Sequence, residues 1–216
     1  MPDISDEEAR ENAFLSNKEI AGMKGYLHAS RRVFVSGTLT EKSLKRATLE
    51  LIKLDFEKTE PILMLLESAG GDVVATQQFY DAISLMNSPV DVLAIGDCCS
   101  MAADLVQVCR RRMLMPGVRM LLHYIRASQP WIADDPARLE VDLNYFRQSM
   151  SEIRESRFAL YEKRTNLSRE RLEELFRHGE VHKAYFSAKQ AIELGLADEI
   201  VTDFKLFPRK VAEEKK

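Results

Sequence analysis

Short hydrophobic runs alternate with stretches of helical periodicity along the first half of the chain. Residues 32–37, 62–66 and 90–95 predict strands, and the unbroken apolar run at 62–66 is typical of a strand buried on both faces of a parallel sheet. Helices are predicted between these strands, one beginning at Thr40 and another ending near Met86. The repeated order of strand and helix indicates βαβ crossovers and therefore an α/β fold with a parallel sheet.

The second half of the chain is dominated by one long predicted helix, from about residue 137 to 163. A helix of this length exceeds what one small domain buries, so we expect its apolar seam to contact a helix of a second subunit, with packing on its own sheet as the alternative. A shorter helix is predicted from Ser168 to near Phe176. The apolar residues of the long helix follow a 4-3 repeat that Arg157 interrupts: Leu139, Leu143, Phe146, Met150, Ile153 and Leu160.

The length of 216 residues suits one large domain with an appendage. Residues 1–30 predict an N-terminal helical arm, because Ser5 and Glu8 have the spacing of a capping box. Residues 31–204 form the predicted main domain. The charged segment 205–216 predicts a flexible tail.

Acidic and basic residues are evenly mixed, with 31 Lys and Arg against 34 Asp and Glu and a net charge of −3. Such mixing gives no basic block for nucleic acid or an anionic membrane surface. No apolar run reaches the ~18 residues of a membrane span, and the acidic N-terminus lacks the layout of a secretory signal. We therefore expect neither a nucleic-acid nor a membrane partner.

The three cysteines are Cys98, Cys99 and Cys109. Their odd number does not fit a disulfide framework, and no His or Cys pattern with metal-ligand spacing accompanies them. We interpret them as small buried hydrophobic residues of a protein in a reducing compartment. This predicts a cytoplasmic location, with no metal and no cofactor.

Candidate chemistry gathers where predicted strands end. Ser100 follows the strand at 90–95 and opens a predicted helix, and His123 follows a short predicted strand. Gly71 lies after the buried strand at 62–66, where a backbone without a Cβ can approach a substrate closely. Since the carboxyl ends of parallel strands share one sheet edge, we expect these residues to lie together.

These residues would supply the parts of a serine hydrolase. A serine hydroxyl needs a base to take its proton and N–H donors to hold the oxyanion, and Met101 adds an amide beside Ser100. Taken singly, each has an ordinary explanation: a serine can cap a helix, paired glycines can form a turn, and a histidine can be structural. Their shared position at one predicted edge favours a nucleophilic Ser100 with His123 as its base.

Four motifs, in order over about 170 residues, resemble the ClpP family, the proteolytic subunit of the Clp protease within the crotonase-like superfamily. Residues 67–73 (ESAGGDV) resemble the family's NSPGGSV segment, and residues 96–103 (GDCCSMAA) resemble its nucleophile box GQAASMGA. Residues 121–123 (LLH) resemble MIH, with Pro116 before them. Residues 187–198 (SAKQAIELGLAD) resemble the final helix and turn.

The resemblance implies a ClpP/crotonase-like fold of repeated βαβ units, with a protruding handle helix within residues 125–165. It implies a serine endopeptidase that hydrolyses unfolded proteins or peptides through an acyl-enzyme at Ser100, with His123 as base. The amides of Gly71 and Met101 would form the oxyanion hole. It also implies a homo-oligomer of one seven-membered ring or two stacked rings, a polypeptide substrate and an unfoldase ATPase partner.

The third catalytic position departs from the family, which has an aspartate there. In this chain the position falls on His182 or Lys183, depending on a one-residue gap. A neutral His182 could orient the base, Glu180 could do so if the loop shifts, and Lys183 would oppose an imidazolium. We favour His182, and a plain cluster of surface charges is the alternative.

Three other segments differ from the family. Residues 126–131 (RASQPW) replace a glycine-rich strand that holds extended substrate and helps join the rings. The acidic N-terminal segment replaces an apolar axial loop, which puts docking of an ATPase in question. Asp97 and Asp104 flank the nucleophile box where the family is uncharged, so they are either solvated or capping residues, or they alter the pocket.

These departures keep two other functions open. The missing aspartate fits a non-catalytic or weakly active ring subunit. The shared oxyanion geometry fits a crotonase-like acyl-CoA enzyme, although the sequence carries no specific CoA-binding signal.

Overall fold

The computed structural model describes residues 17–125, 135–182 and 185–203. The strands are β1 (Arg32–Ser36), β2 (Ile62–Ser68), β3 (Val90–Cys99), β4 (Arg112–Leu114), β5 (Arg119–Leu121), β6 (Phe186–Ser187) and β7 (Glu199–Ile200). The helices are α2 (Asn17–Ala29), α3 (Glu41–Glu57), α4 (Val73–Ser84), α5 (Met101–Val108), α6 (Pro136–Arg164), α7 (Arg169–His182) and α8 (Ala188–Glu193).

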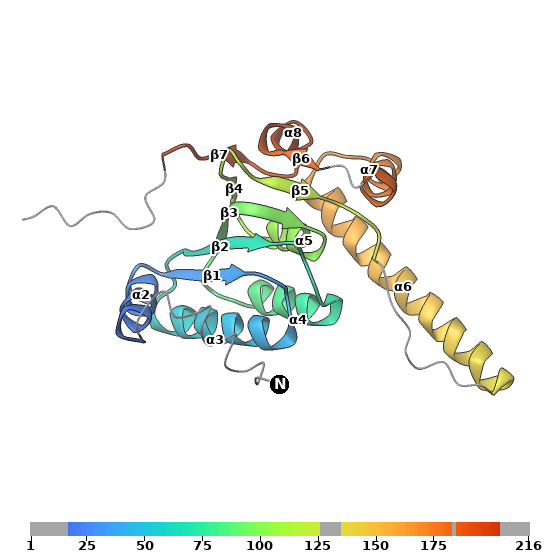
Figure 1. Ribbon diagram of the computed structural model, residues 1–216, viewed down its shortest axis with the longest axis horizontal. Coiled ribbons are helices and arrows are strands. Elements are labelled where there is room, and N and C mark those ends of the chain that lie inside the picture. Colours follow the sequence, from blue (N-terminus) through green and yellow to red (C-terminus); the bar gives the residue numbers. More distant parts are fainter. Residues whose placement is uncertain (1–16, 126–134, 183–184, 204–216) are drawn as a thin grey trace, which may run out of the picture.

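A mainly parallel sheet organises the molecule, in the order β1-β2-β3-β4-β7 (Figure 1). Each step along this order is parallel, as the predicted βαβ crossovers require. The first part of β3 pairs with β4, and its last three residues pair with β5 instead. Strand β5 thus begins where β4 leaves the sheet, and β6 adds to it antiparallel.

Helices α3, α4 and α5 lie side by side along the sheet (Figure 1). Helix α3 begins where the sequence predicts, because the Thr40 side chain accepts from the Ser43 amide and the Ser43 side chain accepts from the Thr40 amide. Its predicted apolar face is the buried one. The buried residues of that face are Leu44, Ala47, Leu51 and Leu54.

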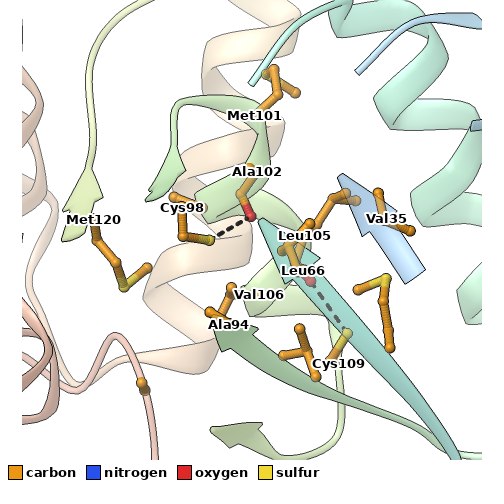
Figure 2. Packing of buried hydrophobic residues seen from close by; sticks show 14 of the residues in the cluster. Val35, Leu66, Ala94, Cys98, Met101, Ala102, Leu105, Val106, Cys109 and Met120 are labelled. Atoms are coloured by element: carbon orange, nitrogen blue, oxygen red, sulfur yellow. Dashed lines mark hydrogen bonds between the residues drawn. The ribbon is translucent and has the colours of Figure 1, made fainter. Parts of the chain in front are cut away.

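All three cysteines are free and buried, and Cys98 and Cys109 belong to the hydrophobic core. Figure 2 shows the Cys98 thiol donating to the Ala102 carbonyl and the Cys109 thiol to the Leu105 carbonyl, at 3.4 and 3.3 Å. The prediction that they act as small buried hydrophobic residues is confirmed.

None of the described helices is long and apolar enough to cross a membrane.

Helix α6 projects away from the rest of the molecule (Figure 1). Between residues 138 and 156 no side chain is buried, whereas Arg157, Phe158 and Tyr161 are buried against the domain. Packing on its own domain is therefore confirmed for the end of the helix, and contact of the outer part with a second subunit stays a prediction. The outer part is free of its own domain, and the last two turns pack on it.

Two predicted boundaries are wrong. Strand β3 runs to Cys99 rather than ending near residue 95, because pairing with β5 extends it. Helix α7 continues to His182 rather than ending near Phe176, and it does so through Gly179. Tertiary contact at that glycine, described below, overrides its poor helix propensity.

Some predictions concern segments outside the described residues. These are the first part of the predicted arm (1–16), the segment at 126–131 that differs from the family, and the predicted flexible tail (205–216).

Candidate active site

Ser100 sits in a strained turn between β3 and α5. Its φ of 56° and ψ of −128° lie where a residue with a Cβ is rarely found, at a cost of order 1–3 kcal/mol. Hydrogen bonds hold it from both sides: its amide donates to the Leu121 carbonyl at 2.7 Å, and its carbonyl accepts from Ala103 at 2.9 Å. A serine held in a sharp strand-to-helix turn is the geometry of an exposed nucleophile.

The glycine loop after β2 lies directly against this turn. Gly70 has a φ of 101°, and a Cβ on it would be 2.7 Å from the Ser100 Cβ and 3.2 Å from the Met101 nitrogen. Only glycine tolerates both the conformation and the approach. The predicted meeting of the glycine pair with Ser100 at one edge of the sheet is confirmed.

Gly71 is clamped by Leu39. The Leu39 amide donates to the Gly70 carbonyl at 3.0 Å, and the Asp72 amide donates to the Leu39 carbonyl at 2.7 Å. A Cβ on Gly71 would be 2.1 Å from the Leu39 carbonyl oxygen. In such a parallel bridge the N–H of the middle residue points away from the partner strand, so the Gly71 amide faces away from Leu39.

The loop is fixed further by Ser68, a buried residue that sequence reasoning did not single out. Its hydroxyl donates to the Gly37 carbonyl and accepts from the Gly70 amide at 3.0 Å. At the other end Asp72 caps α4, because its carboxylate accepts from the Ala75 amide at 2.7 Å. The segment is therefore a rigid support for Gly71.

His123 lies on the chain segment next to Ser100. Cys99 pairs with Leu121, whose carbonyl accepts from Ser100, and His123 follows two residues later. Beyond β5 the segment packs on α7, where a Cβ on Gly179 would be 1.7 Å from the Leu122 carbonyl oxygen. The prediction that the serine and histidine come from two neighbouring strand ends is confirmed.

Asp104 is buried beneath the site, so the interpretation of it as a solvated residue is wrong. Its carboxylate accepts from Arg157 at 2.6 and 3.2 Å and from the Tyr161 hydroxyl at 2.8 Å. Burial opposes the charge of Arg157, but the Asp104 carboxylate outweighs this and raises the pKa of the guanidinium. Burial and the same carboxylate raise the pKa of Tyr161 well above its ordinary value.

Asp97, the other acidic residue at the nucleophile box, is paired at the surface. Arg119 donates to both of its carboxylate oxygens at 2.8 Å, and the guanidinium lies over the Tyr185 ring at 5.0 Å. Burial and then the Asp97 charge raise the pKa of the neighbouring Cys99 thiol to about 11. Cys99 is therefore a thiol at neutral pH and a poor competitor to Ser100 as nucleophile.

The predicted third member cannot be placed by its side chain. His182 is the last residue of α7, and its side chain and that of Glu180 lie outside the described part of the structure, as does Lys183. Among the described residues, no group of three His, Cys, Asp or Glu side chains is arranged to hold a metal ion.

A parallel α/β sheet that ends in a strained serine, beside a helix N-terminus and a glycine loop, defines the class of acyl-transferring serine hydrolases. A sequence model of the Clp protease family matches residues 16–204. The chain belongs to the Clp protease family and is a divergent ClpP-type serine peptidase. The family, fold class and function class predicted from the motifs are confirmed.

Curated relatives carry the same family name. The chain is 30% identical over 178 residues to ATP-dependent Clp protease proteolytic subunit 1 of Chlamydia trachomatis serovar D, covering 81% of this chain and 88% of the relative. It is 26% identical over 175 residues to the ATP-dependent Clp protease proteolytic subunit of Deinococcus radiodurans, covering 79% and 80%. It is 26% identical over 180 residues to subunit 1 of Protochlamydia amoebophila, covering 82% of each.

Proposed function

We propose that Ser100 and His123 cleave peptide bonds of unfolded proteins or peptides through an acyl-enzyme. The Ser100 hydroxyl attacks the scissile carbonyl carbon while a His123 ring nitrogen takes its proton. His123 then passes this proton to the leaving amine, and water, deprotonated by the same ring, releases the acyl group. The observation that carries the proposal is the strained Ser100, whose amide is held by the strand that leads to His123.

Gly71 and Met101 are the proposed oxyanion donors. The Gly71 amide faces away from Leu39, and Met101 is the first residue of α5, where amides lack a partner within the helix. The close approach of Gly70 to the Met101 nitrogen supports a position of the two donors near each other. Two donors fixed by the scaffold need no rearrangement when charge develops on the substrate oxygen.

His182 is the proposed orienting group for His123. Helix α7 runs unbroken to His182, and Gly179, three residues earlier, packs against the main chain of Leu122. Positions three apart on a helix share a face. A neutral imidazole fixes a tautomer but stabilises an imidazolium less than a carboxylate does, so His182→Asp should raise kcat, whereas Lys183→Ala should change it little.

A fluorophosphonate probe and a fluorogenic peptide test the proposal together. Wild-type protein should label at Ser100 and cleave the peptide, and Ser100→Ala and His123→Ala should each lower kcat by on the order of 10⁴-fold or more. Stable wild-type protein that neither labels nor cleaves would instead be a non-catalytic ring subunit. Measurable CoA binding by calorimetry would favour the acyl-CoA enzyme.

We further propose that the chain forms a homo-oligomeric ring, a heptamer or two stacked heptamers. Leu49, Ile52 and Phe56 form an exposed apolar stripe along one face of α3, with Phe56 92% exposed. The outer part of α6 exposes Val141 and Tyr145. Ile52→Asp should break the ring itself, and Val141→Asp should separate stacked rings while leaving single rings, as measured by light scattering after size exclusion.

The names of the relatives suggest a partner, and the free cysteines suggest a cellular location. The relatives are named ATP-dependent, so we propose an unfoldase ATPase as partner, with residues 1–30 as an arm outside the peptidase domain 31–204. ATP-dependent degradation of an unfolded protein by the mixed components tests this. The three free thiols support a cytoplasmic location.

A further inference from the structure

The main chain at His123 is held from outside the sheet. Strand β5 ends at Leu121, so no strand pairing reaches the base itself. The Leu122 carbonyl instead abuts Gly179 of α7, and the His123 carbonyl accepts a hydrogen bond from Nη1 of Arg157 at 3.2 Å. The position of the base therefore depends on α6 and α7.

The next residue is held by the same two helices. The Tyr124 ring packs edge-on against Phe158 of α6, with centroids 6.2 Å apart, and lies 5.9 Å from Phe176 of α7. The Tyr124 hydroxyl donates to the Glu173 carbonyl at 3.5 Å. Leu122, His123 and Tyr124 thus each contact α6 or α7.

The Arg157 guanidinium is held by both an ion pair and an aromatic ring. Its Nε and Nη2 donate to the two carboxylate oxygens of Asp104, which also accepts from Tyr161. The face of the guanidinium lies over the Phe176 ring at 4.9 Å. Only a planar fork can make the carboxylate pair and still direct a further N–H at the His123 carbonyl.

The two charged residues come from elements with different tasks. Asp104 lies four residues after Ser100, one turn into the helix that the nucleophile opens. Arg157 lies on α6 at the point where the helix leaves the domain, since residues 138–156 have no buried side chain. The ion pair therefore joins the nucleophile helix, the base and the projecting helix.

We propose that Arg157 is a positioning residue for His123: held by Asp104 and Tyr161, it fixes the His123 carbonyl and with it the place of the imidazole beside Ser100. This rests on the proposed catalytic pair. Because Arg157 belongs to α6, the projecting helix contacts the main chain of the base directly through this side chain.

Stability alone does not account for the pair. Replacing a buried ion pair by apolar residues of similar volume is often neutral or stabilising, whereas removing one partner leaves an uncompensated charge. An apolar replacement of the whole group keeps the packing and removes the hold on the carbonyl. Such a variant therefore separates a role in stability from a role in positioning His123.

The experiment compares wild type with the triple variant Asp104→Leu/Arg157→Met/Tyr161→Phe. The triple variant should melt near the wild-type temperature, yet its kcat for a fluorogenic peptide and its labelling rate at Ser100 should fall about 10- to 100-fold, as for a displaced base. Asp104 and Arg157 also line a small pocket with Met101, so KM is measured too. A wild-type kcat, or an effect confined to KM, would overturn the proposal.

Two further variants complete the design. Arg110→Met removes a more exposed arginine that also donates to both oxygens of an aspartate, Asp91, at the opposite end of β3, and should leave kcat unchanged. Arg157→Lys keeps the charge without the fork and should give an intermediate kcat, which supplies the test if the triple variant does not fold. A wild-type kcat in Arg157→Lys would then count against the proposal.

Amide hydrogen exchange of the 119–125 segment reads the hold on the main chain without any need for activity. Arg157→Lys and the triple variant should exchange faster there than wild type and Arg110→Met. Wild-type protein that fails to label at Ser100 would overturn the catalytic assignment. Unchanged exchange in the Arg157 variants would overturn the positioning role.

Discussion

The close contact of Gly179 with the chain before His123 gives a sharp prediction for Gly179→Ala. The new Cβ would be 1.7 Å from the Leu122 carbonyl oxygen and 3.3 Å from a Leu121 methyl carbon. The two backbones would have to separate by roughly 2 Å before the contact became attractive. Overpacking of this kind costs about 1–3 kcal/mol.

Alanine also favours the helix, and a control variant removes that contribution. Gly25 lies inside α2, and a Cβ on it would meet nothing within 4 Å. Alanine gains about 1 kcal/mol over glycine in a helix interior, a gain that both variants share. The difference in unfolding free energy between Gly179→Ala and Gly25→Ala should therefore be the packing cost alone, about 1–3 kcal/mol.

Thermal melting at fixed protein concentration measures this difference. In a domain of this size, 1 kcal/mol shifts Tm by about 2–4 °C, so Gly25→Ala should melt higher than wild type and Gly179→Ala should melt below Gly25→Ala. Because Leu122 precedes the base, Gly179→Ala should also slow labelling of Ser100, by up to roughly 100-fold. Equal Tm shifts in the two variants would refute the close contact.

Three further variants test other parts of the structure. Gly70→Ala should fold but lose Ser100 labelling by roughly 100-fold or more, since its Cβ would displace the nucleophile; normal labelling would contradict the approach. Thr40→Ala should lose the cap of α3 and about 1 kcal/mol, seen as a lower Tm. Burial acts to raise the pKa of Asp198, but hydrogen bonds from Arg112 outweigh this effect, and the pKa is lowered. The ionised carboxylate therefore stabilises the fold at pH values above its unfolded pKa of ~3.9. The Tm gap between wild type and Asp198→Asn should therefore be present at pH 7 and shrink as pH falls below about 4.

Much of the sheet could be predicted from the sequence because its strands are short apolar runs separated by helical periodicity. The end of β3 could not, since Gly96 and the polar Asp97 look like a turn, and only pairing with β5 continues the strand. The end of α7 at His182 could not be predicted either. Gly179 is a poor helix residue, and the contact that favours it there lies more than fifty residues away in the chain.

The site shows the same division. Ser100, His123 and Gly71 were found because each follows a predicted strand, and parallel strands bring their ends to one edge. The clamp by Leu39 and the support from Ser68 were missed, because a leucine and a serine in those places carry no pattern of their own. The strain at Ser100 is likewise a property of the folded chain, for nothing in the residues 96–103 prescribes its φ.

The sequence shows Asp104 and Arg157 separately, each as a charged residue within an apolar helical pattern. Asp104 interrupts an apolar helix in which every residue from Met101 to Gln107 is buried, and Arg157 interrupts the apolar repeat of α6. A buried charge without a partner is too costly to persist, so each interruption demanded an opposite charge somewhere in the fold. Two opposite charges, each out of place on its own helix, could have been matched with each other from the residue pattern alone. The match would have placed the end of the long helix beneath Ser100, packed on its own domain.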